Sequence, residues 1–217
     1  RFTDMSRVFY HAKSFNGDIS KWDVSNVRDM SSMFQGATLF NGDISKWDVS
    51  SVTNMEGMLR FASVFNGDLS MWDVSSVTTM RSTFNKASKF NGDLSRWDVS
   101  SLTDMGYMFN TAKSFNQDIS GWKTGSVTSM KFMFLNAQRF NQPLTWDTSN
   151  VTTMASMFKN ARVFNQNISG WKTAAVTDMS DMLRGAQAFD QDLSGWNVDG
   201  VTNHSSFDEG ADNWCGL

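Results

Sequence analysis

Apolar and polar residues follow two different rhythms within each stretch of about 25 residues. In the segment 19–27, Trp22 and Val24 are apolar while their immediate neighbours are polar, and this period of two indicates a half-buried strand. In the segment 30–37, apolar residues occupy positions i, i+3, i+4 and i+7, namely Met30, Met33, Phe34 and Ala37. That spacing is typical of one face of a short helix. We therefore predict a strand followed by a short helix.

The same pattern recurs along the whole chain. Phenylalanine returns at steps of 25 residues, with a single step of 24, at Phe15, Phe40, Phe65, Phe90, Phe115, Phe140, Phe164 and Phe189. Tryptophan returns in the same way at Trp22, Trp47, Trp72, Trp97, Trp122, Trp146, Trp171 and Trp196. The shortened unit contains the single proline, Pro143, which indicates an altered turn. Because one such unit cannot bury its own apolar face, we expect residues 1–217 to form a single stacked array.

One strand and one short helix per 25 residues is the build of a leucine-rich repeat. The fold class predicted is α/β: a leucine-rich-repeat-type solenoid of about eight coils, with parallel strands on one face and short helices on the other. Threonines at the expected helix starts, such as Thr53, are suited to capping, and Thr53 with Glu56 forms a capping-box pattern. The alternative is a three-sided parallel β-helix, which the helical spacing disfavours.

The residues of one unit also support a family resemblance. The string Phe-Asn-Gly-Asp-Ile-Ser-Lys-Trp-Asp-Val-Ser-Asn-Val at 15–27, followed by Asp29, Met30, Met33, Phe34 and Ala37, resembles the 25- or 26-residue bacterial surface-protein repeat. That family is grouped with the BspA-like leucine-rich-repeat proteins. The resemblance covers essentially the whole chain. It implies a surface or secreted binding and adhesion module, and it supplies no catalytic residues.

Composition narrows the function. Charged residues make up 19% of the chain and the formal net charge is −3, so neither a nucleic-acid partner nor a polybasic membrane surface is indicated. No apolar run is long enough for a transmembrane segment. One cysteine, Cys215, and two histidines leave little for metal sites or nucleophilic triads. We expect no catalytic residues, no metal and no cofactor.

Several repeated columns have a structural interpretation. The tryptophan column shares strand parity with Val24 and its equivalents, so we expect these rings to be buried. The acidic column that begins at Asp18 stands beside Asn-Gly turns, where Asp and Asn hydrogen-bond to backbone. The asparagine column from Asn16 to Asn165 reads as a ladder of amides between coils.

The predicted strand face offers the first candidate binding surface. Its acidic residues would lie at strand spacing and repel one another, with basic residues two positions away to offset them in a charge lattice. The candidate residues are Lys21, Asp23, Lys46, Asp48, Met71, Asp73, Arg96 and Asp98. A calcium site here is disfavoured, because calcium needs six to eight oxygen ligands and these strands gather few in one place.

The predicted helix side offers the second candidate surface. Tyr107, Phe132 and Leu135 are apolar at positions that other units fill with polar residues. In a stack they would form one docking patch, unless the shortened unit near Pro143 shifts the coils and buries them. Both possibilities remain open from the sequence.

These observations favour a non-enzymatic extracellular or cell-surface interaction module that binds a protein or glycan through its strand face. The alternative is a structural or assembly subunit that acts as a rigid spacer against neighbouring subunits. The chain begins in the middle of a unit and ends within a ninth, which we interpret as a fragment of a longer protein.

Overall fold

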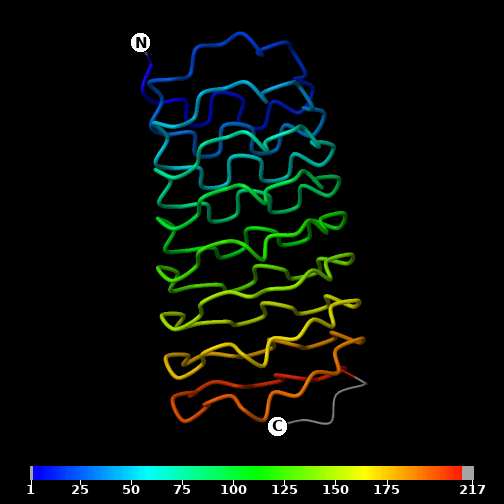
Figure 1. Cartoon of the computed structure of the whole chain (residues 1–217). Helices are drawn as coiled ribbons and strands as arrows, with labels where there is room; N and C mark the ends of the chain where they lie inside the picture. The colour runs from blue at the N-terminus through cyan, green and yellow to red at the C-terminus, as the bar shows by residue number, and fades with distance from the viewer. Residues whose placement is uncertain (1, 212–217) are drawn as a thin grey trace.

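The computed structural model describes residues 2–211 and shows a chain wound into stacked coils (Figure 1). The N-terminal coils lie at one end of the stack and the C-terminal coils at the other. Residues one repeat apart lie side by side, as the parallel bridge between Asp29 and Asn54 shows. Each repeat therefore completes one coil, as predicted, and neighbouring coils run parallel.

The predicted α/β architecture is wrong. Across residues 2–211 the structure contains no helix and no extended strand. The only β-type pairings in this part of the chain are isolated parallel bridges, one from each coil to the next: Asp4–Asp29, Asp29–Asn54, Asn54–Thr79, Thr79–Asp104, Asp104–Ser129, Ser129–Thr153, Thr153–Asp178 and Asp178–Asn203. A leucine-rich repeat needs a continuous parallel sheet, and these single bridges do not form one.

The segment predicted to be a helix, 30–37, is a run of overlapping β-turns. The N–H of Met33 donates to the carbonyl of Met30, and the N–H of Ala37 donates to the carbonyl of Phe34. Ser32 and Gly36, the third residues of these two turns, have φ angles of 54° and 74°, as in type II turns. A right-handed helix cannot accommodate such left-handed residues.

The turns explain why the sequence imitates a helix. Each turn of four residues places its corner outward and its ends inward, so that Met30, Met33, Phe34 and Ala37 are buried. Two consecutive turns therefore produce the spacing i, i+3, i+4 and i+7. A helix of 3.6 residues per turn produces the same stripe over eight residues, so hydrophobic spacing does not distinguish the two.

Hydrogen bonds between coils occupy every second N–H group of this segment. Ser32, Phe34 and Gly36 donate to the carbonyls of Glu56, Met58 and Arg60 at 2.8 Å each. The corresponding bonds recur at each coil and always point from a coil toward the next one in the sequence. An isolated eight-residue helix is marginal in water, whereas these turns satisfy the same N–H groups against a neighbouring coil.

The segment 19–27 is also built from turns. Trp22 donates its N–H to the carbonyl of Ile19, and Val27 donates to Val24. The alternation of Trp22 and Val24 with polar neighbours is therefore local and does not extend into a strand. The outer surface of this segment and its equivalents is called the tryptophan face below, and the outer surface of 29–37 and its equivalents is called the turn face.

The core between the two faces contains the repeated apolar columns. Phe40, Phe65 and Phe90 are fully buried and stack coil upon coil, with ring centroids 5.7 and 6.0 Å apart. The tryptophan column is buried as predicted from Trp47 to Trp196, with Trp97, for example, 3% exposed, whereas Trp22 in the first coil is 39% exposed. Its indole N–H donates to the carbonyl of Leu69 at 2.9 Å, which a buried indole requires.

The threonine column does not cap helices. The hydroxyl of Thr53 donates to the carbonyl of Arg28 in the preceding coil. The N–H of Glu56 donates to the side-chain oxygen of Asn54 and not to Thr53. The capping-box interpretation of Thr53 and Glu56 is therefore also wrong. Both residues instead help to connect or shape turns.

We expect Trp97→Ala to lower the free energy of unfolding by about 3–5 kcal/mol, because it leaves a cavity among stacked rings and frees the Leu69 carbonyl. The exposed neighbour provides the control: Asp98→Ala should cost less than about 1 kcal/mol. Urea unfolding followed by circular dichroism measures both. Equal losses for the two variants would contradict the inward orientation of the tryptophans.

A second prediction concerns the left-handed positions of the turns. Gly185 has a φ of 69°, and a Cβ there would collide with the Asn160 side-chain oxygen. We expect Gly185→Ala to lower stability by at least about 1 kcal/mol through backbone strain alone. Gly195→Ala is the matched control, because nothing lies within 4 Å of its Cβ position. Similar melting temperatures for both variants would argue against the turn geometry.

Candidate functional site

The tryptophan face presents all eight residues proposed for the strand face as exposed side chains: Lys21, Asp23, Lys46, Asp48, Met71, Asp73, Arg96 and Asp98. Four of them, Met71, Asp73, Arg96 and Asp98, line one shallow hollow of about 290 Å³. There the Arg96 guanidinium lies 3.6 Å from the Met71 sulfur. The other four lie outside this hollow.

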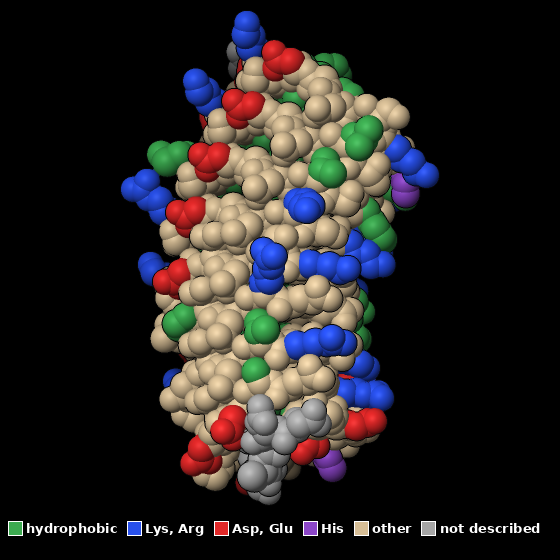
Figure 2. Space-filling view, turned by 90° about the vertical axis from the view of Figure 1, so that its right-hand side faces the viewer, with side chains coloured by type: hydrophobic (Ala, Val, Ile, Leu, Met, Phe, Trp, Pro, Cys, Tyr) green, Lys and Arg blue, Asp and Glu red, His purple; other side chains and the backbone are tan. Residues whose placement is uncertain are grey.

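The acidic residues of this face are held by serines rather than by the predicted charge lattice. Asp48 accepts hydrogen bonds from the hydroxyl and the N–H of Ser50, at 2.6 and 3.1 Å. These two hydrogen bonds hold the pKa of Asp48 below its ordinary value of 3.8, and the bond from the hydroxyl has the larger effect. Lys46 acts instead on Asp43, where it adds a minor lowering of the carboxyl pKa. Figure 2 shows acidic side chains one above another along one edge of the stack.

Two columns behave as the sequence predicts. The side-chain oxygen of Asn16 accepts the N–H of Asn41 at 2.9 Å, and the same contact repeats up the stack as far as Asp190. Asp18 accepts the N–H of Ser20 within its own turn. The asparagine ladder and the acidic turn column therefore have confirmed structural roles.

Tyr107, Phe132 and Leu135 lie half-buried on the turn face rather than on a helix. The rings of Tyr107 and Phe132 stack with centroids 4.6 Å apart, and the Arg81 guanidinium lies 5.2 Å from the Tyr107 ring centre. Both aromatic residues have left-handed backbones, with φ of 61° and 59°. Bulky residues rarely adopt this conformation, and the hydrophobic spacing gave no indication of it.

A polar groove on the turn face was not foreseen. It has a volume of about 690 Å³ and crosses the first five coils. Its lining includes Arg7, Arg60, Arg81, Lys86, Asn85 and Tyr107. These residues occupy outward turn positions that change from coil to coil, and a comparison of residues 25 apart at positions such as 35, 60 and 85 would have exposed that variability.

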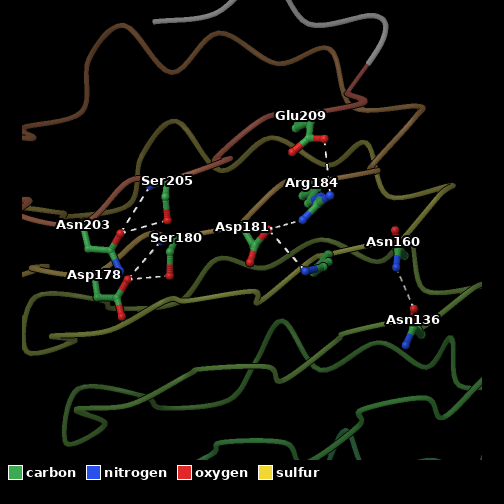
Figure 3. A network of polar contacts seen from close by, with 10 residues as sticks. Asn136, Asn160, Asp178, Ser180, Asp181, Arg184, Asn203, Ser205 and Glu209 are labelled. Carbon is green, nitrogen blue, oxygen red and sulfur yellow. Dashed lines mark hydrogen bonds and ion pairs between the residues drawn. The ribbon is translucent and has the colours of Figure 1, made fainter.

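Charges on the C-terminal part of the turn face neutralise one another. Asp181 contacts both Lys159 and Arg184 at 3.2 Å, and Arg184 also contacts Glu209 at 3.3 Å. Figure 3 shows this network beside the Asn136–Asn160 amide contact. This part of the face is internally satisfied, in contrast to the groove.

Two other kinds of feature would bear on function in the described part of the chain, a metal site and a membrane-spanning helix. Within residues 2–211, no three His, Cys, Asp or Glu side chains come together in a way that could hold a metal ion. Nor does that range include a helix with the length and apolarity needed to cross a membrane. Cys215 lies outside the described residues.

The stacked coils and the apolar columns between two faces define a repeat protein built from turns. The chain belongs to the family described as Mycoplasma protein of unknown function, DUF285, whose model matches residues 1–87, 62–145 and 141–215. No curated protein matches the chain.

The Asp–Ser pairs of the tryptophan face predict a defined response to acid. A folded-state pKa below the ordinary value contributes stability that is present above pH 3.8 and is lost as the pH falls through the folded value. Ser50→Ala should therefore raise the pKa of Asp48 and reduce the acid-induced loss of stability. Carboxyl NMR titration measures the first effect. Ser51→Ala, which leaves the Asp48 contacts intact, is the control, and an unchanged Asp48 pKa in Ser50→Ala would contradict the assignment.

Proposed function

We propose that the chain is a non-enzymatic interaction module that binds a protein or glycan through an outer face of its stack. The supporting observation is the contrast between the two faces. The tryptophan face repeats the same Asp–Ser turn in four successive coils, at Asp23, Asp48, Asp73 and Asp98, before Lys123 and Lys172 take the place of the aspartate in later coils. The turn face varies at each outward position: one column reads Tyr10, Gln35, Arg60, Asn85, Asn110, Leu135, Lys159, Arg184 and Glu209.

Backbone hydrogen bonding makes this variation possible. Outward residues such as Gln35 and Arg60 connect their coils through main-chain groups, for example from the Gly36 N–H to the Arg60 carbonyl at 2.8 Å. Their side chains are not needed to hold the coils together and are available for recognition. We therefore favour the turn face over the strand face that the sequence suggested.

The location of the module is part of the proposal. The resemblance of the unit at 15–40 to the BspA-like surface-protein repeat supports an extracellular or cell-surface role. The family match itself carries no function.

A rigid spacer or assembly subunit is the second candidate. It is favoured by the stacked Tyr107 and Phe132 rings, which leave a half-exposed aromatic pair on the turn face. Exposed aromatic groups of this kind are common at interfaces. A spacer would bind one subunit stoichiometrically through this pair.

The test compares the two faces in one binding assay against arrays of extracellular proteins and glycans. We expect Arg81→Glu with Lys131→Glu, on the turn face, to lower retention at least about tenfold, because reversed charges repel the same partner. Lys46→Glu with Asp73→Lys, on the tryptophan face, should leave retention unchanged.

The opposite ranking would place the partner on the tryptophan face. No retention of any array member would contradict the interaction module. A stoichiometric protein partner lost only in Phe132→Ser would establish the assembly role. Melting temperatures of all variants, measured in parallel, separate lost binding from lost folding.

A further inference from the structure

We propose that the turn-face groove binds an anionic glycan, a saccharide chain carrying carboxylate or sulfate groups; this rests on the proposed interaction function and assigns it a site and a ligand class. Asn85 lines the groove and is only 4% exposed, yet its Oδ1 has no hydrogen-bond partner among residues 2–211. The buried Nε of Arg60, in the coil before it, is also unpartnered within that range. Such atoms are costly unless a ligand satisfies them.

The charge of the groove is unbalanced. Arg7, Arg60, Arg81 and Lys86 line it, with Glu56 as the lining carboxylate. Within residues 2–211, Arg81 reaches Asp104 at 3.6 Å, whereas Arg7, Arg60 and Lys86 have no acidic side chain within 4.0 Å. Guanidinium groups bind carboxylates and sulfate-like oxyanions through paired N–H donors. The groove therefore attracts anions, in contrast to the neutralised network around Asp181.

Aromatic rings hold these cations in place. The Arg60 guanidinium carbon lies 5.1 Å and the Lys86 Nζ 4.7 Å from the centre of the Phe61 ring, within the range of cation–π attraction. Arg7 lies in the same way over Tyr10, at 5.6 Å. Cations arranged in advance lose less side-chain entropy when a ligand binds.

The floor of the groove favours a saccharide over a peptide strand. The N–H groups of Ser32 and Gly57 already donate to the carbonyls of Glu56 and Arg81, so these main-chain groups are not free to pair with an added β-strand. Recognition falls to the hydroxyl and amide side chains of Ser32, Gln35 and Asn85. Vicinal hydroxyls of a sugar both donate and accept hydrogen bonds, which matches an unpaired Asn oxygen beside an unpaired Arg N–H.

The ligand must fit over a glycine and extend along the stack. A Cβ at Gly57 would lie 3.3 Å from the Gln35 Oε1 and 3.4 Å from the Ser32 Oγ, so the hollow depends on the missing side chain. Coils about 4.8 Å apart place Arg7 roughly 14 Å from Lys86 along the stack. This length suits an oligosaccharide of several units rather than a single sugar.

The experiment measures binding of this chain to dextran sulfate, polygalacturonate, neutral dextran and poly-glutamate by calorimetry at low and at physiological salt. We expect the two anionic polysaccharides to bind, the neutral one not to bind, and poly-glutamate to bind more weakly than the anionic polysaccharides. Arg60→Gln should weaken binding at least about tenfold, and Glu56→Gln should strengthen it. Arg139→Gln, an exposed residue outside the groove, removes the same charge and should have little effect.

Neutral substitution of the buried amide gives a second test that does not depend on net charge. Asn85→Leu should weaken binding to the anionic polymers without changing its salt dependence, because it removes hydrogen bonds but no charge. Binding to only one anionic polymer would assign sulfate or carboxylate as the recognised group. Circular dichroism and melting temperatures confirm that each variant is folded.

Three results would overturn the proposal. Equal losses in Arg60→Gln and Arg139→Gln would show general attraction to polyanions. Failure to bind either anionic polymer at low salt would exclude the ligand class. Tighter binding of poly-glutamate than of both polysaccharides would assign an acidic polypeptide. Failure to bind the anionic polysaccharides, or tighter binding of poly-glutamate, would still be compatible with the proposed interaction function. That function is contradicted only if the array assay finds no partner.

Discussion

Hydrogen bonds between the coils of the turn face are the interaction on which the rest of the structure depends. Hydrogen-bonded peptide groups follow one another from coil to coil. The Arg7 N–H donates to the Ser31 carbonyl, and the Ser32 N–H, which belongs to the same peptide group as that carbonyl, donates to the carbonyl of Glu56. The row continues to Asp181 and Ser205. Hydrogen bonds in such chains polarise one another. Because the alignment uses only main-chain atoms and apolar packing from one side, it places little restriction on the outward side chains.

That freedom separates stability from recognition within each coil. On the tryptophan face, turns depend on particular side chains, such as Asp48 with Ser50, and beside this face the side chain of Asn16 binds the next coil. The Asp–Ser turns of the first four coils are therefore alike. The shortened unit shows the same division: its missing residue leaves the Phe132–Ala155 bond on the turn face intact at 2.8 Å. A coil can therefore lose a residue outside the turn face, provided that the hydrogen-bond register of the turn face is kept.

The sequence predicted the repeat, the buried tryptophans and the asparagine ladder, because each depends on a residue type that recurs in a fixed column. It did not predict the turns, since Met30, Met33, Phe34 and Ala37 fit a short helix equally well. Left-handed backbone at Tyr107 and Phe132 carries no signal in residue type, because glycine or asparagine is expected there. The groove was missed for a related reason: an assumed helix directs attention to its apolar stripe, whereas Arg60 and Asn85 occupy the corners of turns.

The three hydrogen-bonded rows that begin at Arg7, Phe9 and His11 share one direction, whereas the row through Thr78, Thr53 and Arg28 runs the opposite way. Every peptide in the three rows points its N–H toward the C-terminal coils and its carbonyl toward the N-terminal coils, so the dipoles of these rows add as they do in a helix. One end of each row offers donors and the other offers acceptors. Two such rows can continue into each other only head to tail, and a twofold-symmetric junction would set like groups against each other. Through the peptides of these three rows, coils can be added end to end only in one direction, as in an open heterologous contact.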